Sequence, residues 1–234
     1  AEAGPDKLFC DGSTGAIIGG SPTATGGTPP FSYSWSPNGG TLNFDNVSNP
    51  VATPSSTTTY TVIVSDTNNC TGTDNMTINV NPPIVISFSQ TDVPCFGDSS
   101  GTAVASASGG SSPFTYLWNT PPPQANDTAI SLPIGTYVVT VTDDSSCTAM
   151  DSVTITQPSL LSVSIAAGEI SCNSANDGGA TANPSGGTSP YTFLWSPGGQ
   201  TTQTINSLIP GTYCVTVTDA NGCDSSACKT FVNP

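Results

Sequence analysis

Residues 186–195 read Gly-Gly-Thr-Ser-Pro-Tyr-Thr-Phe-Leu-Trp, a glycine turn that leads into a strand of alternating aromatic residues. Nearly the same passage occurs at residues 26–35 and again at residues 109–118. The Trp residues that end these passages, Trp35, Trp118 and Trp195, are 83 and 77 positions apart. Because the repeats of solenoid proteins are only about 20–50 residues long, this spacing predicts an array of small domains.

A second repeated strand follows each passage, at residues 59–66, 136–143 and 212–219. In the last copy Tyr213, Val215 and Val217 alternate with Thr and Cys, and the other copies share the pattern. Alternation with a period of two indicates a strand with one buried face and one face in water. Since Pro and Gly recur throughout and no helical periodicity is present, the chain is predicted to be all-β, built from three tandem β-sandwiches.

The aromatic residues of these strands are predicted to form the domain cores. An aromatic stripe can also bind carbohydrate, but a domain of about 78 residues needs its largest side chains inside. The predicted core aromatics are Trp35, Trp118, Trp195, Tyr60, Tyr137 and Tyr213.

Pro-containing linkers mark the predicted domain boundaries, at residues 81–83 and 157–158. The three domains are therefore expected at residues 1–81, 82–157 and 158–234. An apolar strand follows each linker, whereas only residues 1–9 precede Cys10 in the first copy. This difference leaves two interpretations: the chain is cut from a longer array, or its first domain has an open groove for a neighbour's strand.

The charge composition excludes several classes of function. The chain has 2 Lys+Arg against 16 Asp+Glu, a net charge of −14, and no His. Proteins that bind nucleic acids or anionic membranes need Lys and Arg to neutralise phosphates, so neither partner is expected. No apolar run of about 18 residues is present to span a bilayer. Without His or Arg, most acid–base and nucleophilic mechanisms lack their groups, and the protein is expected not to be an enzyme.

Eight cysteines in small Thr-rich domains indicate a disulfide framework made in an oxidising compartment. Each copy has one Cys near its start and another four residues after the Asp that ends its second strand, which predicts one bridge inside each domain. The last hairpin, centred on Asn221, places two further cysteines opposite each other. A zinc site is excluded because the chain has no C-x-x-C motif and no His. The predicted bridges are Cys10–Cys70, Cys95–Cys147, Cys172–Cys223 and Cys214–Cys228.

Calcium is the one cofactor for which the sequence gives a pattern. Asp98 and Asp177 follow the first Cys of their copies, while Asp143 and Asp219 end the Tyr-containing strands. The predicted bridges would bring these carboxylates together near a domain junction, where oxygen ligands could hold Ca²⁺. Asp also begins turns for local hydrogen-bonding reasons, and no calcium-loop motif is present, so the alternative is a structural role without any cofactor.

The repeated cassette resembles the SprB-type repeat of Bacteroidetes surface proteins, named for a gliding-motility adhesin. The third copy is most similar, in Gly186–Tyr191, Trp195–Pro197, Gly211–Tyr213 and Asn221–Cys223. The first copy departs from the pattern at residues 51–60, where it is similar to the PKD-like domains of the same kind of protein. The resemblance implies Ig-like sandwiches on a secreted adhesive or filament-forming glycoprotein, and it brings no catalytic residues. It also implies O-glycosylation at Thr128 and Ser152, which stand in Asp-Thr-Ala and Asp-Ser-Val.

Together these features predict a non-enzymatic extracellular protein, the repeat shaft of a bacterial surface adhesin or filament that mediates cell adhesion. Its expected partners are neighbouring repeats or copies of itself, with surface glycans as a further candidate. One alternative is a fibre subunit that self-assembles by β-strand complementation at the first domain. Another is an adhesive module that binds calcium or glycan.

Overall fold

The computed structural model describes residues 1–10, 12–172 and 176–232, and all its regular elements are strands. None of the described residues belongs to a helix, so these ranges contain no membrane-crossing helix. The first strands are β1 (Lys7–Phe9), β2 (Ala16–Ile17), β3 (Ser32–Ser36), β4 (Val51–Ala52), β5 (Thr58–Ser65) and β6 (Thr71–Val80). Next come β7 (Val85–Thr91), β8 (Gly101–Ser108), β9 (Thr115–Trp118), β10 (Thr128–Leu132), β11 (Gly135–Thr142) and β12 (Thr148–Ile155). The last are β13 (Ser162–Gly168), β14 (Gly178–Ser185), β15 (Thr192–Ser196), β16 (Thr204–Leu208), β17 (Gly211–Thr218) and β18 (Asp224–Phe231).

These strands form three pairs of sheets, as the repeat predicts for tandem sandwiches. The orders are β1-β6-β5-β3 with β2-β4, then β10-β8-β7 with β12-β11-β9, and finally β13-β14-β16 with β15-β17-β18. The linkers predicted from Pro lie between β6 and β7 and between β12 and β13. The precise domain boundaries stay predictions, and the expected end at residue 234 lies outside the described residues.

The chain divides into two compact units, and the division passes through the middle sandwich. Unit 1 comprises residues 1–87, 105–127 and 139–151, and unit 2 comprises residues 88–104, 128–138 and 152–234. Unit 1 therefore holds the whole first sandwich together with the hairpin of the second. Unit 2 holds the first cysteine loop of the second sandwich together with the whole third sandwich.

In unit 1, the long strand β6 organises the first sandwich. It pairs antiparallel with β5, from Thr58 opposite Ile78 to Ser65 opposite Thr71. On its other side it pairs parallel with β1, where Phe9 lies opposite Val80. This second pairing corrects the expectation that the first copy lacks a strand before Cys10. Ala3 is fully buried in the core, so residues 1–9 occupy the place that the sequence left open.

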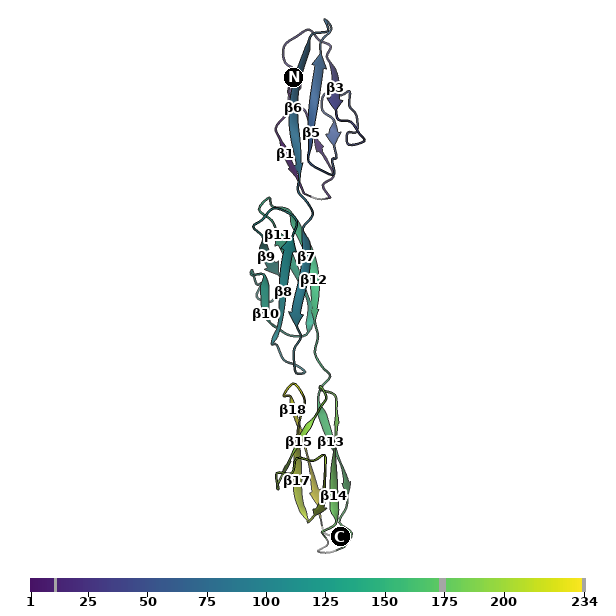
Figure 1. Cartoon of the computed structure of the whole chain (residues 1–234), viewed down its shortest axis with the longest axis vertical. Coiled ribbons are helices and arrows are strands. Elements are labelled where there is room, and N and C mark those ends of the chain that lie inside the picture. The colour runs from purple at the N-terminus through teal and green to yellow at the C-terminus, as the bar shows by residue number, and fades with distance from the viewer. Residues whose placement is uncertain (11, 173–175, 233–234) are drawn as a thin grey trace. The chain divides into compact units, whose positions relative to one another are not determined.

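In unit 2, the third sandwich shows the arrangement most simply (Figure 1). Strand β17 pairs with β15 and β18, while β14 pairs with β13 and β16. Tyr213, Val215 and Val217 of β17 all face the core and are at most 9 % exposed. Threonine hydroxyls pair on the outer face, as between Thr212 and Thr230 at 2.9 Å. The alternation in the sequence thus predicted both faces correctly.

All six aromatic residues predicted for the cores are buried, which confirms that interpretation. A buried indole N–H needs an acceptor, and each Trp donates to a backbone carbonyl on its own sandwich. Trp195 Nε1, for example, lies 2.9 Å from the oxygen of Thr202. Tyr137 donates its hydroxyl to the carbonyl of Pro133 at 2.9 Å, and burial raises the pKa of this phenol. These rings are therefore structural and do not form an exposed carbohydrate platform.

Two adjacent residues at the end of β18 provide a test of the core. Phe231 is 1 % exposed and packs edge-on against Tyr213, with ring centroids 5.8 Å apart, whereas Val232 is 65 % exposed. Phe231→Ala should destabilise the third sandwich by about 3–5 kcal/mol because it leaves a cavity. Val232→Ala should change its stability by less than about 0.5 kcal/mol. Urea unfolding followed by Trp fluorescence measures both, and similar losses would contradict this assignment of the core.

Candidate functional site at the sandwich junctions

Each sandwich ends its Tyr-containing strand with an Asp whose carboxylate holds the following turn, and we call this arrangement the hairpin clamp. In the third sandwich, Asp219 Oδ1 accepts the backbone N–H groups of Asn221 and Cys223, both at 2.9 Å. Its Oδ2 accepts the N–H of Thr188, beside the Gly-Gly turn, at 2.8 Å. One carboxylate therefore fixes both the position of the hairpin Cys and the turn that precedes the aromatic strand.

The same clamp occurs in the other two sandwiches. Asp143 Oδ1 accepts the N–H of Cys147 at 2.8 Å, and its Oδ2 accepts that of Ser111 at 2.9 Å. In the first sandwich Asp66 accepts the N–H of Cys70 at 2.9 Å and that of Thr28 at 3.1 Å. The identical contacts explain why the Asp and the Cys stand four residues apart in all three copies.

The clamp lowers the pKa of its carboxyl group. Burial of Asp143 raises its pKa, but hydrogen bonds from backbone N–H groups, led by that of Ser111, outweigh this effect. The same balance, with Cys223 as the leading donor, lowers the pKa of Asp219. In both cases the folded-state pKa lies below the ordinary 3.8, because the N–H groups favour the charged carboxylate.

The Gly-Gly turn beside each clamp receives the linker that enters the sandwich. The N–H of Gly187 donates to the carbonyl of Ser159 at 2.9 Å, and that of Gly110 donates to Pro82 at 3.3 Å. A Cβ on Gly109 would overlap the carbonyl oxygen of Pro83, and its φ of +74° also favours glycine. These glycines are thus required because the linker backbone passes directly over the turn.

The clamps of the second and third sandwiches are each connected by one disulfide to the sandwich that precedes them. Cys147 of the second sandwich is bonded to Cys10 of the first, with Cα atoms 5.4 Å apart. Cys223 of the third sandwich is bonded to Cys95 of the second, with Cα atoms 5.7 Å apart. The first bridge lies within unit 1 and the second within unit 2.

These bonds overturn three of the predicted pairings, Cys10–Cys70, Cys95–Cys147 and Cys172–Cys223. The reason is the length of the last strand in each sandwich. Cys70 directly precedes β6, while Cys10 follows β1 and lies beside the other end of β6, where Phe9 pairs with Val80. The ten residues of β6 span about 30 Å at roughly 3.3 Å per residue, far beyond the reach of a disulfide. The two cysteines of one sandwich therefore lie at opposite ends.

The fourth predicted bridge, Cys214–Cys228, is confirmed. The two cysteines are directly opposite each other in the pairing of β17 with β18, and their Cα atoms are 4.0 Å apart. The turn centred on Asn221 determines the register of this hairpin, so the sequence alone was sufficient to predict the Cys214–Cys228 bridge.

Asparagine side chains add polar contacts at both junctions. In unit 1, the Nδ2 of Asn81 in the linker donates to Asp143 Oδ2 at 3.3 Å. In unit 2, the Nδ2 of Asn221 donates to the carbonyl of Pro94, next to Cys95, at 2.9 Å. Each covalent bridge is thus accompanied by a hydrogen bond between the same two sandwiches. No pattern in the sequence predicts these contacts, since the positions of the two Asn residues indicate only a linker and a turn.

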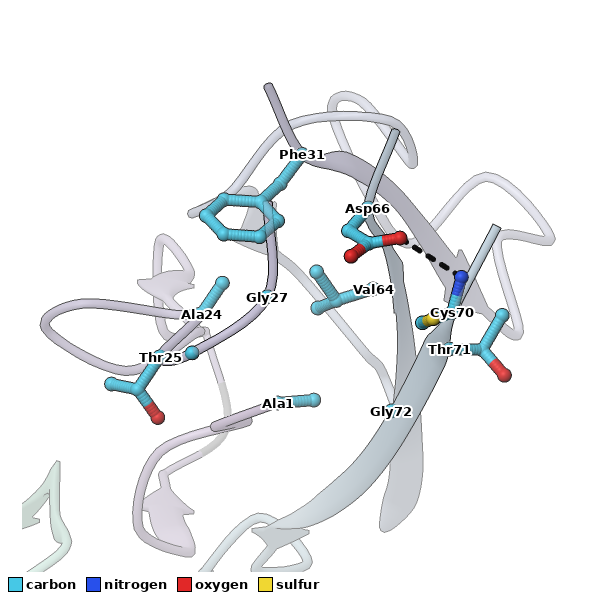
Figure 2. Close-up of a pocket in the computed structure, with 11 residues that line it drawn as sticks. Ala1, Ala24, Thr25, Gly27, Phe31, Val64, Asp66, Cys70, Thr71 and Gly72 are labelled. Atoms are coloured by element: carbon cyan, nitrogen blue, oxygen red, sulfur yellow. Dashed lines mark hydrogen bonds between the residues drawn. The ribbon is translucent and has the colours of Figure 1, made fainter. Parts of the chain in front are cut away.

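Two cysteines remain unpaired, and one of them borders a pocket. Cys70 and Cys172 are both exposed. Figure 2 shows Cys70 at a pocket of about 190 Å³ that Ala1, Phe31 and Val64 also line. The pocket lies beside Gly26 and Gly27, the first sandwich's Gly-Gly turn. In the other two sandwiches this turn is covered by the linker.

Three of the four carboxylates proposed as calcium ligands have other partners in the structure. Asp143 and Asp219 direct their oxygens at N–H donors, as described above, and Asp177 accepts the hydroxyl of Ser171 at 2.5 Å. Asp98 lies in the exposed turn that follows Cys95. Within residues 1–10, 12–172 and 176–232, no three acidic, Cys or His side chains gather as a metal site would require. Calcium binding stays a prediction that only a titration tests.

The two predicted O-glycosylation sites lie on strands of the middle sandwich. Thr128 begins β10 and is half-buried, while Ser152 lies within β12 and is exposed. Both modifications stay predictions.

With this geometry the class of protein is clear: the chain is a tandem array of Ig-like sandwiches. Its structure aligns with that of the eight N-terminal Ig domains of Down syndrome cell adhesion molecule, with a TM-score of 0.54 and 12 % sequence identity. The alignment covers 98 % of this chain. It spans 36 % of that chain. Three titin domains, I67–I69, match with a TM-score of 0.46 and 11 % identity over 100 % of this chain and 97 % of theirs. At 12 % identity, the likeness to the cell adhesion molecule concerns the fold alone.

The sequence comparison identifies the kind of repeat. The SprB repeat model matches residues 87–123 and 165–200, in the second and third sandwiches. These segments of the two sandwiches are therefore similar to SprB repeats, in line with the resemblance seen in the sequence. No curated protein sequence matches the chain.

The pairing of cysteines can be mapped directly. An Asp lies between every two successive cysteines, so cleavage by an Asp-specific protease under non-reducing conditions separates all eight. Mass spectrometry should find the peptides of Cys10 and Cys147 joined, and likewise those of Cys95 and Cys223. Joined peptides of Cys10 and Cys70 would contradict the structure.

The clamp also predicts that the stability of the fold depends on pH. Variants of the neighbouring residues Asp143 and Asp144 test whether this dependence comes from the clamp. The folded-state pKa of Asp143 is lowered, so its charged carboxylate stabilises the fold at pH values above the unfolded-state pKa. This stabilisation is lost as the pH falls through the folded-state pKa. The urea midpoint of the wild type should therefore fall between pH 6 and pH 3. Asp143→Asn should lower the midpoint at pH 6 and reduce this fall. Asp144→Asn, at an exposed carboxylate, is the matched control, and the same effect from it would refute the assignment.

Proposed function

We propose that this chain is a non-enzymatic extracellular structural segment, a repeat shaft in a bacterial surface adhesin or filament. The SprB repeats and the Ig-like fold support the placement on a cell surface. Three disulfides among the described residues support an oxidising, extracellular setting. The predicted core aromatics are buried, and the clamp carboxylates accept backbone hydrogen bonds. These side chains therefore have structural roles, which supports a non-enzymatic function.

The observation that carries this proposal is the pair of bridges between successive sandwiches. A disulfide inside a sandwich would stabilise that sandwich alone. Cys10–Cys147 and Cys95–Cys223 instead limit the motion of one sandwich against the next, within unit 1 and unit 2 respectively. Inter-domain interfaces within a chain are by default small and allow relative motion, so a covalent bond across each junction is a specific addition. Restricting that motion is what a shaft requires.

Two alternative functions remain as predictions. A calcium- or glycan-binding module would have to bind through groups other than the buried Trp residues. Calorimetric titration with Ca²⁺, together with a glycan array, tests it. Strand complementation at the first sandwich is restricted by β1, which already pairs with the outer side of β6 over Lys7–Phe9.

The shaft proposal is tested by removing one bridge at a time. The double variant Cys95→Ser/Cys223→Ser frees the second junction, and small-angle X-ray scattering should then show the increased flexibility of a multi-domain chain. Cys214→Ser/Cys228→Ser is the matched control, because it removes a bridge inside the β17–β18 hairpin and should leave the scattering unchanged. Trp fluorescence verifies that both variants remain folded. Unchanged scattering from the Cys95–Cys223 variant would contradict a stiffening role.

A further inference from the structure

We propose that Asn38 is a site of slow chemical modification, at which the side-chain amide is lost as ammonia and the residue becomes Asp or isoaspartate. The proposal goes beyond the shaft function and does not depend on it. It starts from the sequence, in which Gly follows Asn at two positions, Asn38-Gly39 and Asn221-Gly222. Because Gly has no Cβ, its backbone nitrogen can approach the side chain of the preceding Asn more easily than that of any other residue.

The reaction joins the backbone of Gly39 to the side chain of Asn38. The Gly39 nitrogen loses its proton and attacks Asn38 Cγ, the bond from Cγ to Nδ2 breaks, and the amide nitrogen leaves with that proton as ammonia. Water then opens the resulting cyclic imide at either of its two carbonyl carbons. One opening gives Asp, and the other gives isoaspartate, in which the main chain runs through the side-chain carbon. Water is the one co-reactant.

The structure leaves the attacking nitrogen free at the first position and holds it at the second. Asn38 begins a tight turn, in which its carbonyl accepts the N–H of Thr41 at 3.0 Å. Within the part of the chain that the structure describes, the N–H of Gly39 has no hydrogen-bond acceptor. The N–H of Gly222 instead donates to the carbonyl of Asp219 at 3.1 Å. The nitrogen of Gly222 must therefore leave the hairpin before it can attack.

The two side-chain amides differ in the same direction. Asn221 Nδ2 donates both to the carbonyl of Pro94 at 2.9 Å and to Thr188 Oγ1 at 3.1 Å. Asn38 Nδ2 donates to Asp45 Oδ2 at 2.6 Å, from an exposed turn. Asn221 thus has more hydrogen bonds to break before it reacts, so a smaller fraction of its conformers is competent.

The space around the turn also permits the reaction. Asn38, Gly39 and Gly40 are all exposed, and a Cβ placed on Gly39 would meet no atom within 4 Å. The turn therefore has room for the imide ring and for the water that opens it. The third sandwich has a similar sequence after its aromatic strand, in residues 196–199, but without the Asn. Of these two turns, that of the first sandwich alone carries the reactive amide.

The modification acts on the loop that covers Trp35. The carbonyl of Asp45 accepts the backbone N–H of Trp35 at 2.8 Å, and the carbonyl of Val47 accepts its Nε1–H at 3.0 Å. The hydrogen bond from Asn38 to Asp45 connects the turn to this loop. After the reaction a carboxylate replaces the donor, so two like charges face each other where a hydrogen bond was. We therefore expect the loop to loosen over Trp35.

The site is tested by following both Asn residues in one sample. The folded protein is incubated at mildly alkaline pH in water labelled with heavy oxygen, and peptide mapping by mass spectrometry measures the replacement of NH₂ by labelled OH. Asn38 should react at least about tenfold faster than Asn221, because the second site must first open. In urea, after reduction of the disulfides, the two sites should react at similar rates.

Gly39→Ala tests the role of the attacking nitrogen. The added methyl group has room in the fold, but it restricts the backbone conformations from which the nitrogen can reach Asn38 Cγ. The variant should slow the reaction at Asn38 by about tenfold. The rate at Asn221 in the same sample is the internal control and should stay unchanged.

Asn38→Asp reproduces one product and tests its effect on the loop. Hydrogen exchange at the backbone N–H of Trp35, measured by NMR, should accelerate by about tenfold as the loop opens more often. Asn38→Gly places the residue of the third sandwich at this position. It removes the hydrogen bond to Asp45 without adding a charge, so it should accelerate the exchange less. An unchanged exchange rate in Asn38→Asp would show that the modification does not reach Trp35.

Three results would overturn the assignment of the site. The first is equal rates at Asn38 and Asn221 in the folded protein, and the second is an unchanged rate at Asn38 in Gly39→Ala. The third is an Asn38 that reacts in urea but not in the folded protein, which would show that the fold protects it. None of these measurements involves the bridges between sandwiches, so their outcome is independent of the shaft proposal.

Discussion

The carboxylate of Asp143 connects three parts of the chain that are distant in sequence. It accepts the N–H of Cys147 in the hairpin, the N–H of Ser111 beside the Gly-Gly turn and the amide of Asn81 in the linker. A charged acceptor in a site this shielded makes strong hydrogen bonds, and removing it would leave several donors without a partner. The positions of the hairpin Cys, of the turn and of the entering linker all depend on this one side chain. Its equivalents, Asp66 and Asp219, do the same for the hairpin and turn of their own sandwiches.

The sequence predicted well whatever depends on local pattern. The period of two placed Tyr213, Val215 and Val217 in the core, and the hairpin centred on Asn221 paired Cys214 with Cys228. In both cases the information lies within one strand or two adjacent strands, where the alternation of side chains fixes the result.

The sequence failed where the result depends on which end of a strand a residue occupies. Each copy has one Cys near its start and a second Cys in its hairpin clamp. A repeat with this pattern is consistent both with a disulfide inside each copy and with a disulfide between one copy and the next. Cys10 and Cys70 are separated by the length of β6, and the parallel pairing of β1 with β6 has no local signature. Because the pairing of β1 with β6 has no local signature, the sequence analysis also did not predict a strand before Cys10. The junction contacts of Asn81 and Asn221 were missed for the same reason, since they join residues of successive sandwiches.

The two bridges between sandwiches interleave, because Cys95 lies inside the loop closed by Cys10–Cys147 and Cys147 lies inside the loop closed by Cys95–Cys223. Every peptide bond from residue 10 to residue 223 is therefore spanned by at least one disulfide. A protease that cuts the backbone once anywhere in this range leaves the chain as a single covalent molecule. Had each sandwich been closed by its own bridge, one cut in either linker would have severed the chain. Interleaving thus protects the exposed linkers, which are the segments that proteases reach most readily.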